Sequence, residues 1–159
     1  MTLMQCLVEP FLPVSVSREL SVYLDELWIR HFADVPRVTT VKIVYGAAWK
    51  MRLGLIKLSQ DESLSCIMIN ALLRLPEVPE YVLVATIAHE LAHYAHGFGS
   101  PLPRRYEHPH ANRVVERELE RRELGLYLFC CNQWIDKEWY AFYDKQRVYG
   151  GTHICRSSL

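Results

Sequence analysis

The chain has 159 residues, half of them hydrophobic, so it can bury one sizeable core, and a disordered chain is excluded. Its 18 basic and 18 acidic side chains give a formal net charge of zero, which excludes a global electrostatic attraction to nucleic acid or to anionic membranes. We therefore expect a single domain over residues 1–159.

Cysteine usage indicates a reducing compartment. The chain has 5 cysteines, an odd number, and none of them forms a Cys-x-x-Cys pair, so neither a disulfide framework nor a zinc ribbon is expected. Residues 1–16 lack the basic start of a signal peptide, and no apolar run reaches about 18 uncharged residues. These features predict a cytoplasmic protein without a membrane partner.

The first half of the chain predicts a helix followed by three short strands. Apolar residues recur at helical spacing from Leu20 to Trp28, which predicts a helix near residues 17–32. Strands are expected over 38–45, over 49–58 with Gly54 as a possible bulge, and over 66–70. Because the connections are short, we expect a mainly antiparallel meander lying on the first helix.

The second half predicts helices. Pro79 suits the first turn of an almost wholly apolar helix, and Gly97 suits its end. The loop over 97–109 is long enough to gate a neighbouring site. A helix rich in Arg and Glu is expected over about 111–124, and Gly125 separates it from a last amphipathic stretch. The apolar face of that stretch carries Leu128, Cys131, Ile135, Trp139 and Phe142.

The sequence His89-Glu90-Leu91-Ala92-His93 lies in the middle of the apolar helix. Residues four apart share a helix face, so His89 and His93 can offer ring nitrogens to one ion. Glu90 borders the same site and can hold a water there without binding the ion itself. Imidazoles and a carboxylate are costly inside a buried helix unless something binds them. The pattern therefore predicts a zinc (Zn2+) site of the catalytic kind.

A catalytic zinc takes three protein ligands, so a third one is needed. We expect His110, because it opens the Arg/Glu-rich helix and the residue four positions later is apolar. His108 lies two residues earlier and is the alternative. His96 lies on the ligand face of the apolar helix but is in line with the other two rings, which suits a tetrahedral ion poorly. Glu116 or Glu120 would serve in a site of the glutamate type.

The order of motifs resembles the SprT-like and YgjP-like zinc metallopeptidases, which are small zincins. The resemblance covers roughly residues 40–125. It rests on Leu55-Ile56-Lys57-Leu58-Ser59, then Ile69-Asn70-Ala71-Leu72-Leu73-Arg74-Leu75-Pro76, then Val82 to His93, and a later histidine that opens a helix. The metzincin pattern is excluded, because position 99 is Gly where that pattern requires a third His.

The resemblance implies an α+β zincin domain with an N-terminal helix, a three-stranded mainly antiparallel sheet, an active-site helix and C-terminal helices. It implies that His89, His93 and His110 bind zinc and that Glu90 is the general base. The chain departs from the family pattern after the third histidine, where Ala111 replaces a Gly and Val114 replaces an aromatic residue. Many SprT-like members carry a zinc ribbon or a DNA-binding tail; neither is expected here, so a nucleic-acid partner is not favoured.

These observations predict a zinc-dependent metallopeptidase that hydrolyses peptide bonds in a protein or peptide substrate through a zinc-activated water. Tyr106 and His108 are the candidates for a group that stabilises the oxyanion. The main alternative is a zincin-fold module that binds zinc for regulation or interaction without catalysis. A third reading, a metal-free helical interaction protein, rests only on the aromatic-rich stretch from Trp134 to Tyr143.

Overall fold

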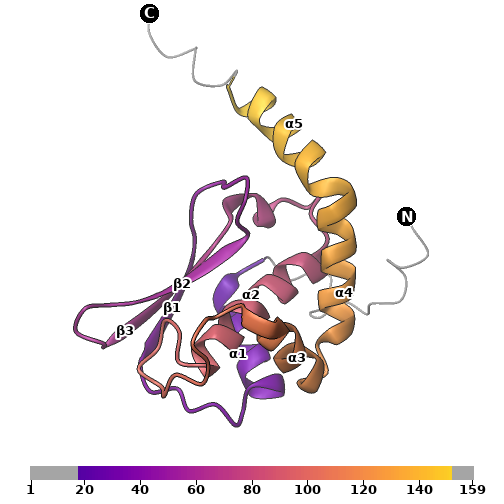
Figure 1. Cartoon of the computed structure of the whole chain (residues 1–159). Coiled ribbons are helices and arrows are strands. Elements are labelled where there is room, and N and C mark those ends of the chain that lie inside the picture. The colour runs from indigo at the N-terminus through magenta and orange to yellow at the C-terminus, as the bar shows by residue number, and fades with distance from the viewer. Residues whose placement is uncertain (1–17, 152–159) are drawn as a thin grey trace, which may run out of the picture.

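The computed structural model describes residues 18–151, and Figure 1 shows a small sheet beside a group of helices. The expectation that residues 1–16 form no signal peptide lies outside this range. Helix α1 (Leu20–His31) agrees with the prediction, and its apolar face buries Leu24 and Leu27 almost completely. No helix of the described range is long and apolar enough to cross a membrane.

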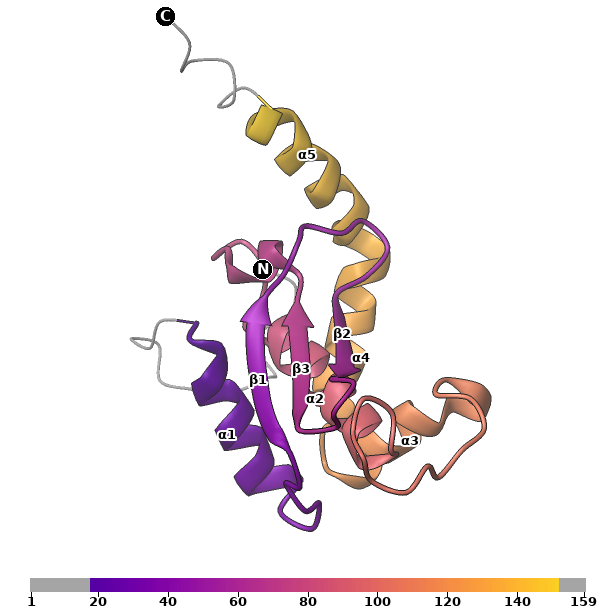
Figure 2. The ribbon, with the colours of Figure 1, turned by 90° about the vertical axis from the view of Figure 1, so that its left-hand side faces the viewer.

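The sheet is mixed, and the predicted mainly antiparallel meander is wrong. Its strands are β1 (Thr40–Tyr45), β2 (Gly54–Leu58) and β3 (Leu64–Ile69), and their order in space is β1-β3-β2 (Figure 2). Strand β3 pairs in parallel with β1 and antiparallel with β2. The α+β class that we expected agrees with this arrangement, but strands that are consecutive in sequence are not all neighbours in space.

Strand β3 takes the central position because it is the most apolar of the three. Ile67 and Ile69 in β3 are fully buried, whereas the outer strands carry the exposed Lys42 and Lys57. Strand β2 begins at Gly54 rather than near residue 49. The buried Asn70 explains this difference, since its side-chain amide donates to the carbonyl oxygens of two residues of the preceding loop, Trp49 and Arg52. The strand order β1-β3-β2 leaves one edge of β2 without a strand partner in the described chain.

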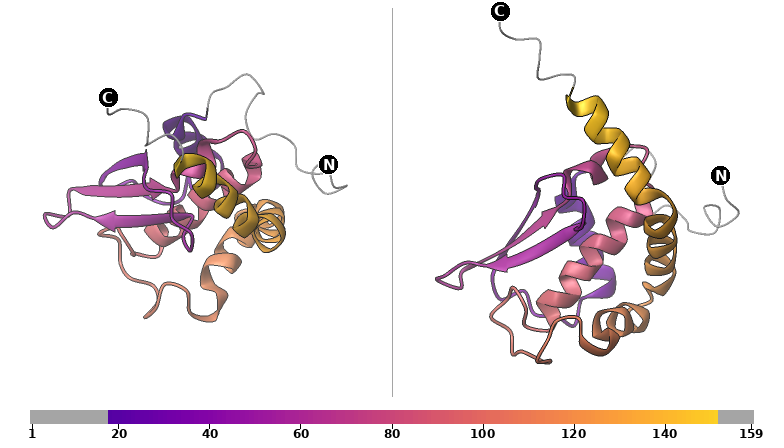
Figure 3. Two further views of the ribbon diagram at one scale, coloured as in Figure 1. Left: turned by 90° about the horizontal axis from the view of Figure 1, so that it is seen from above. Right: turned by 45° about the horizontal axis from the view of Figure 1, so that its top comes forward.

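Helix α2 (Glu80–Ala95) lies between the sheet and α4 (Gly125–Trp134), as the right-hand view of Figure 3 shows. It is buried on nearly all sides, as its apolar sequence predicts. Its end agrees with the prediction as well, because Gly97 has a φ of 80°. A side chain at Gly97 would also meet the carbonyl oxygen of Leu102 at 2.5 Å, so only glycine fits this turn.

The predicted helix over 111–124 is shorter in the structure. Asn112 and Arg113 have φ values of 53° and 55°, so the α-helix begins only after them. The break before the next helix lies at Glu123, with a φ of 63°, and not at Gly125, which is the first residue of α4. The elements are a 3-10 turn (Ala111–Arg113), α3 (Val114–Arg121), α4, a π-helical turn (Ile135–Trp139) and α5 (Tyr140–Gly151).

An ion network centred on the buried Glu118 and Arg122 holds α3 against α1 and α2. Arg122 donates to Glu118 at 2.8 Å and to Asp34, just after α1, at 2.6 Å. The second carboxylate oxygen of Glu118 lies 3.4 Å from Nε2 of His96, which follows α2. The His96 ring and Arg122 lower the pKa of Glu118 to about 2, although burial opposes them. This network therefore holds the C-terminal half of α3 against the ends of α1 and α2.

We expect Glu118→Gln to lower the free energy of unfolding by about 3 kcal/mol near pH 7, because Arg122 would keep a buried charge without its full partner. The pKa of Glu118 is lower in the folded chain than in the unfolded chain, so its contribution is complete above about pH 4.5 and is lost as the pH falls toward 2. Urea unfolding of wild type and variant at both ends of this range measures the difference.

The matched control is Glu26→Gln, which removes an exposed partner of Arg30 at 2.8 Å. We expect it to change the free energy of unfolding by less than about 0.5 kcal/mol. Equal losses in the two variants, or a loss in Glu118→Gln that does not shrink in acid, would contradict the importance of the buried network.

Candidate metal centre

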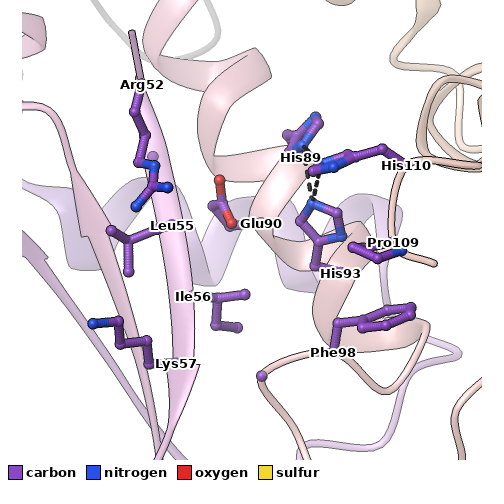
Figure 4. A pocket seen from close by; sticks show the side chains of 12 residues that line it. Arg52, Leu55, Ile56, Lys57, His89, Glu90, His93, Phe98, Pro109 and His110 are labelled. Carbon is purple, nitrogen blue, oxygen red and sulfur yellow. Dashed lines mark hydrogen bonds between the residues drawn. The ribbon is translucent and has the colours of Figure 1, made fainter. Parts of the chain in front are cut away.

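Helix α2 brings three polar side chains, His89, Glu90 and His93, to the wall of one cleft. Glu90 and His93 are only 4% and 6% exposed, and His89 is half-buried. The two imidazoles lie one turn apart, as the i, i+4 spacing predicts, and their Nε2 atoms are 3.0 Å apart. Figure 4 shows the Glu90 carboxylate between these rings and strand β2.

A third imidazole reaches the same point from the other side of the cleft. His110 ends the long loop after α2, and its Nε2 lies 3.0 Å from that of His93 and 3.3 Å from that of His89 (Figure 4). After one intervening residue, Ala111, come two left-handed residues, Asn112 and Arg113. Such conformations are uncommon outside glycine and cluster at functional sites. They turn the chain sharply between His110 and α3.

The arrangement fits a divalent cation. These three histidines form a compact group with the spacing of metal ligands. Zinc binds imidazole at about 2.0–2.1 Å, and tetrahedral geometry then places ligand nitrogens about 3.3 Å apart, close to the observed 3.0–3.3 Å. The Nε2 atoms of three neutral rings cannot satisfy all three contacts by hydrogen-bonding one another, because each N–H makes only one good hydrogen bond. One cation satisfies all three lone pairs.

The electrostatics of the site favour neutral rings. Burial lowers the pKa of His89 to about 4 and that of His93 to about 3, and the neighbouring imidazoles add to both shifts. Both rings are therefore unprotonated near pH 7, which is the form that binds metals. Burial raises the pKa of Glu90 to about 8, against the opposing charge of Arg52. Desolvation thus keeps the ligand rings neutral and raises the pKa of the carboxylate beside them.

The alternative third ligands lie elsewhere. His108 points to solvent with its side chain 73% exposed, and its Nε2 is 3.9 Å from Glu107. His96 is fully buried beside Glu118, so it belongs to the ion network. The charge of Glu116 opposes the lowering of the His89 pKa, but Glu116 is outside the histidine group. Glu120 lies 3.9 Å from Arg113. Of the residues that we considered, His110 is the one placed with the α2 pair.

A cleft runs past the three histidines in two halves. One half, of about 310 Å³, lies between β2 and the loop after α2 and is lined by Lys57 and Phe98. The other, of about 360 Å³, lies against α4 and has an apolar wall. Both volumes are in the range of ligand pockets. The two halves share Arg52, Gly54, His89, Glu90 and His110, so the histidines stand at their junction.

Gly54 and Arg52 are parts of the site that the sequence reading missed. A side-chain carbon at Gly54 would come within 2.8 Å of Glu90 Oε1, so the missing side chain makes room for the carboxylate. A glycine inside a strand signals such close approach, but we had read it as a bulge. Conversely, neither Tyr106 nor His108 lines the cleft, and Tyr106 packs on His96 with ring centroids 4.8 Å apart.

Comparison with known proteins adds no family assignment. No protein-family model matches the chain, and no curated protein matches it. The resemblance to SprT-like proteins therefore stays a prediction from the motifs, and the case for the site depends on its geometry.

We expect His110→Ala to weaken zinc binding by roughly 100-fold or more, because it removes one of three converging nitrogens. His108→Ala is the matched control, since it removes an exposed imidazole two residues away; its affinity should stay within about threefold of wild type. Competition with a fluorescent chelator measures both. A larger loss in His108→Ala than in His110→Ala would reverse the assignment of the third ligand.

Proposed function

We propose that this protein is a zinc-dependent peptidase in which His89, His93 and His110 hold the metal and Glu90 moves the proton. The observation that carries the proposal is a buried carboxylate beside three converging imidazole nitrogens in an open cleft. A purely structural zinc site is normally closed by four protein ligands, whereas a catalytic site keeps a position open. With three histidines as its ligands, a bound zinc would keep a fourth position for water.

When bound, zinc supplies Lewis acidity that polarises a carbonyl and makes water nucleophilic near neutral pH. Glu90 accepts the proton of the attacking water and passes it to the leaving amine nitrogen. Burial raises its pKa to about 8, and the positive charge of a bound cation would lower it again, so that the carboxylate could accept a proton near pH 7. Its burial, at 4% exposure, keeps bulk water from competing for that proton.

Strand β2 supports a peptide as the substrate. It pairs with β3 on one edge only, and it lines the cleft beside Glu90. A free strand edge offers backbone N–H and C=O groups, and an extended peptide can pair with them. Such pairing would place successive substrate peptide bonds along the cleft, with side chains entering its two halves.

The motif resemblance leads to the same function, and we infer a small zincin of the SprT-like kind. Cys66, Cys130 and Cys131 are free thiols, which suits a reducing compartment such as the cytoplasm. The loop over 97–109 lines the cleft through Phe98, Gly99 and Pro109, which suits a gate.

The direct test is Glu90→Gln in zinc-loaded protein. We expect about one zinc per chain in wild type and variant alike, because Glu90 is not in the ligand group, and a loss of proteolysis by about 100- to 10,000-fold in the variant. Elemental analysis and cleavage of an unfolded protein substrate provide the two readouts. Zinc binding without proteolysis in either form would favour the non-catalytic zinc-binding module, whereas equal proteolysis in the two forms would remove Glu90 from the mechanism.

Gly54→Ala tests the space that β2 leaves for Glu90. The added methyl group would stand 2.8 Å from Oε1 and 3.0 Å from Thr86 Cγ2, so the carboxylate must move. We expect kcat/KM to fall by about 10- to 100-fold with zinc content unchanged. The control is Gly125→Ala, where the nearest atom lies at an ordinary 3.5 Å, and its activity should equal that of wild type. Unchanged activity in Gly54→Ala would show that Glu90 tolerates the displacement.

A further inference from the structure

Arg52 is the cation of the cleft whose charge acts on Glu90. It lines both halves, together with Glu90 and the exposed ring of His110 (Figure 4). Its charge acts on the pKa of Glu90, and no ion pair between the two side chains is found among the residues that the structure describes. The guanidinium is exposed and extends along the cleft at the start of β2. It is therefore accessible to a molecule that enters either half.

The backbone of Arg52 is held in place although its side chain is not. Its carbonyl oxygen accepts from the side-chain amide of Asn70 at 2.8 Å, and the next carbonyl, of Leu53, accepts from the backbone N–H of Asn70 at 2.7 Å. Asn70 is fully buried. The loop thus presents Arg52 from a fixed point beside the junction of the two halves. A guanidinium presented in this way loses little further backbone entropy when it binds.

The charges that line the cleft are unbalanced. Arg52 and Lys57 are cationic, and Glu90 is the one acidic residue among those described as lining either half. Arg104 adds a further cation at the rim, where its guanidinium lies 4.6 Å from the ring centre of Phe98. The chain as a whole has a net charge of zero, so this local excess of positive charge is not a consequence of composition. It favours a negatively charged group in the cleft.

We propose that Arg52 is a specificity residue that binds a carboxylate of the substrate next to the bond that is cleaved. The planar guanidinium matches a carboxylate through two parallel hydrogen bonds, which lysine cannot reproduce. The apolar half of the cleft, along Leu53, Leu128 and Ile135, then takes an uncharged side chain from the same substrate. The inference rests on the proposed function, and it narrows the substrate class to peptides with a carboxylate near the scissile bond.

The test compares peptides that differ only by Glu or Gln at one position near an apolar residue, each with an amidated and with a free C-terminus. Fluorescence anisotropy measures their binding to zinc-loaded Glu90→Gln protein, and cleavage by the protein with Glu90 intact gives kcat/KM. We expect the Glu peptide to bind at least about 10-fold more tightly than its Gln partner, the range of a charge-assisted hydrogen bond. In Arg52→Gln this ratio should fall to about one, and Arg52→Lys should restore it only in part.

Lys57→Gln is the control, because it removes a cation from the same cleft without touching Arg52. Its Glu-to-Gln ratio should stay near that of wild type. A discrimination that depends on the free C-terminus and not on Glu would identify the terminal carboxylate as the group bound, which also supports the inference. No discrimination, or one that survives Arg52→Gln, overturns it. Failure to cleave any peptide would contradict only the proposed function, because the binding measurement tests the role of Arg52 without requiring cleavage.

Discussion

The site depends on the burial of helix α2. Helix α2 is apolar on nearly all sides, so its few polar side chains have few places where they are not packed against apolar residues. Here they meet at one cleft. Desolvation then sets their chemistry, since it keeps two imidazoles neutral and raises the pKa of the neighbouring carboxylate. The third imidazole completes a group of nitrogens whose mutual contacts only a cation satisfies. The burial of α2 thus determines both how the metal ligands are arranged and how strongly the site's ionisable groups hold a proton.

The rest of the fold supplies the other walls of this site. The central position of β3 moves β2 to the edge of the sheet, where its first residue, Gly54, gives the Glu90 carboxylate room. On the opposite side, the ion network of Glu118 and Arg122 holds α3 against α1 and α2, and the left-handed turn before α3 directs His110 inward. Residues far apart in sequence therefore shape the same cleft.

Local patterns in the sequence were enough to predict α1, α2, the end of α2 at Gly97 and the proximity of His89 and His93, because each depends on helical spacing or on a single turn. Strand order was mispredicted, because short connections do not reveal that β3 inserts between β1 and β2. His110 was favoured over His108 by its place at a helix start and by the apolar residue four positions later, whereas its convergence on the α2 pair depends on tertiary structure. The space at Gly54 and the exposure of Arg52 are likewise products of tertiary structure, which no local pattern encodes.

The central claim is that three imidazole nitrogens of this chain bind one zinc ion beside Glu90. X-ray absorption at the zinc edge of the purified, zinc-loaded protein tests it most directly. The account predicts a first shell of nitrogen and oxygen atoms at about 2.0–2.1 Å with the outer-shell scattering of three imidazoles. A shell containing sulfur at about 2.3 Å, or a spectrum without imidazole scattering, would place the metal elsewhere and contradict the account.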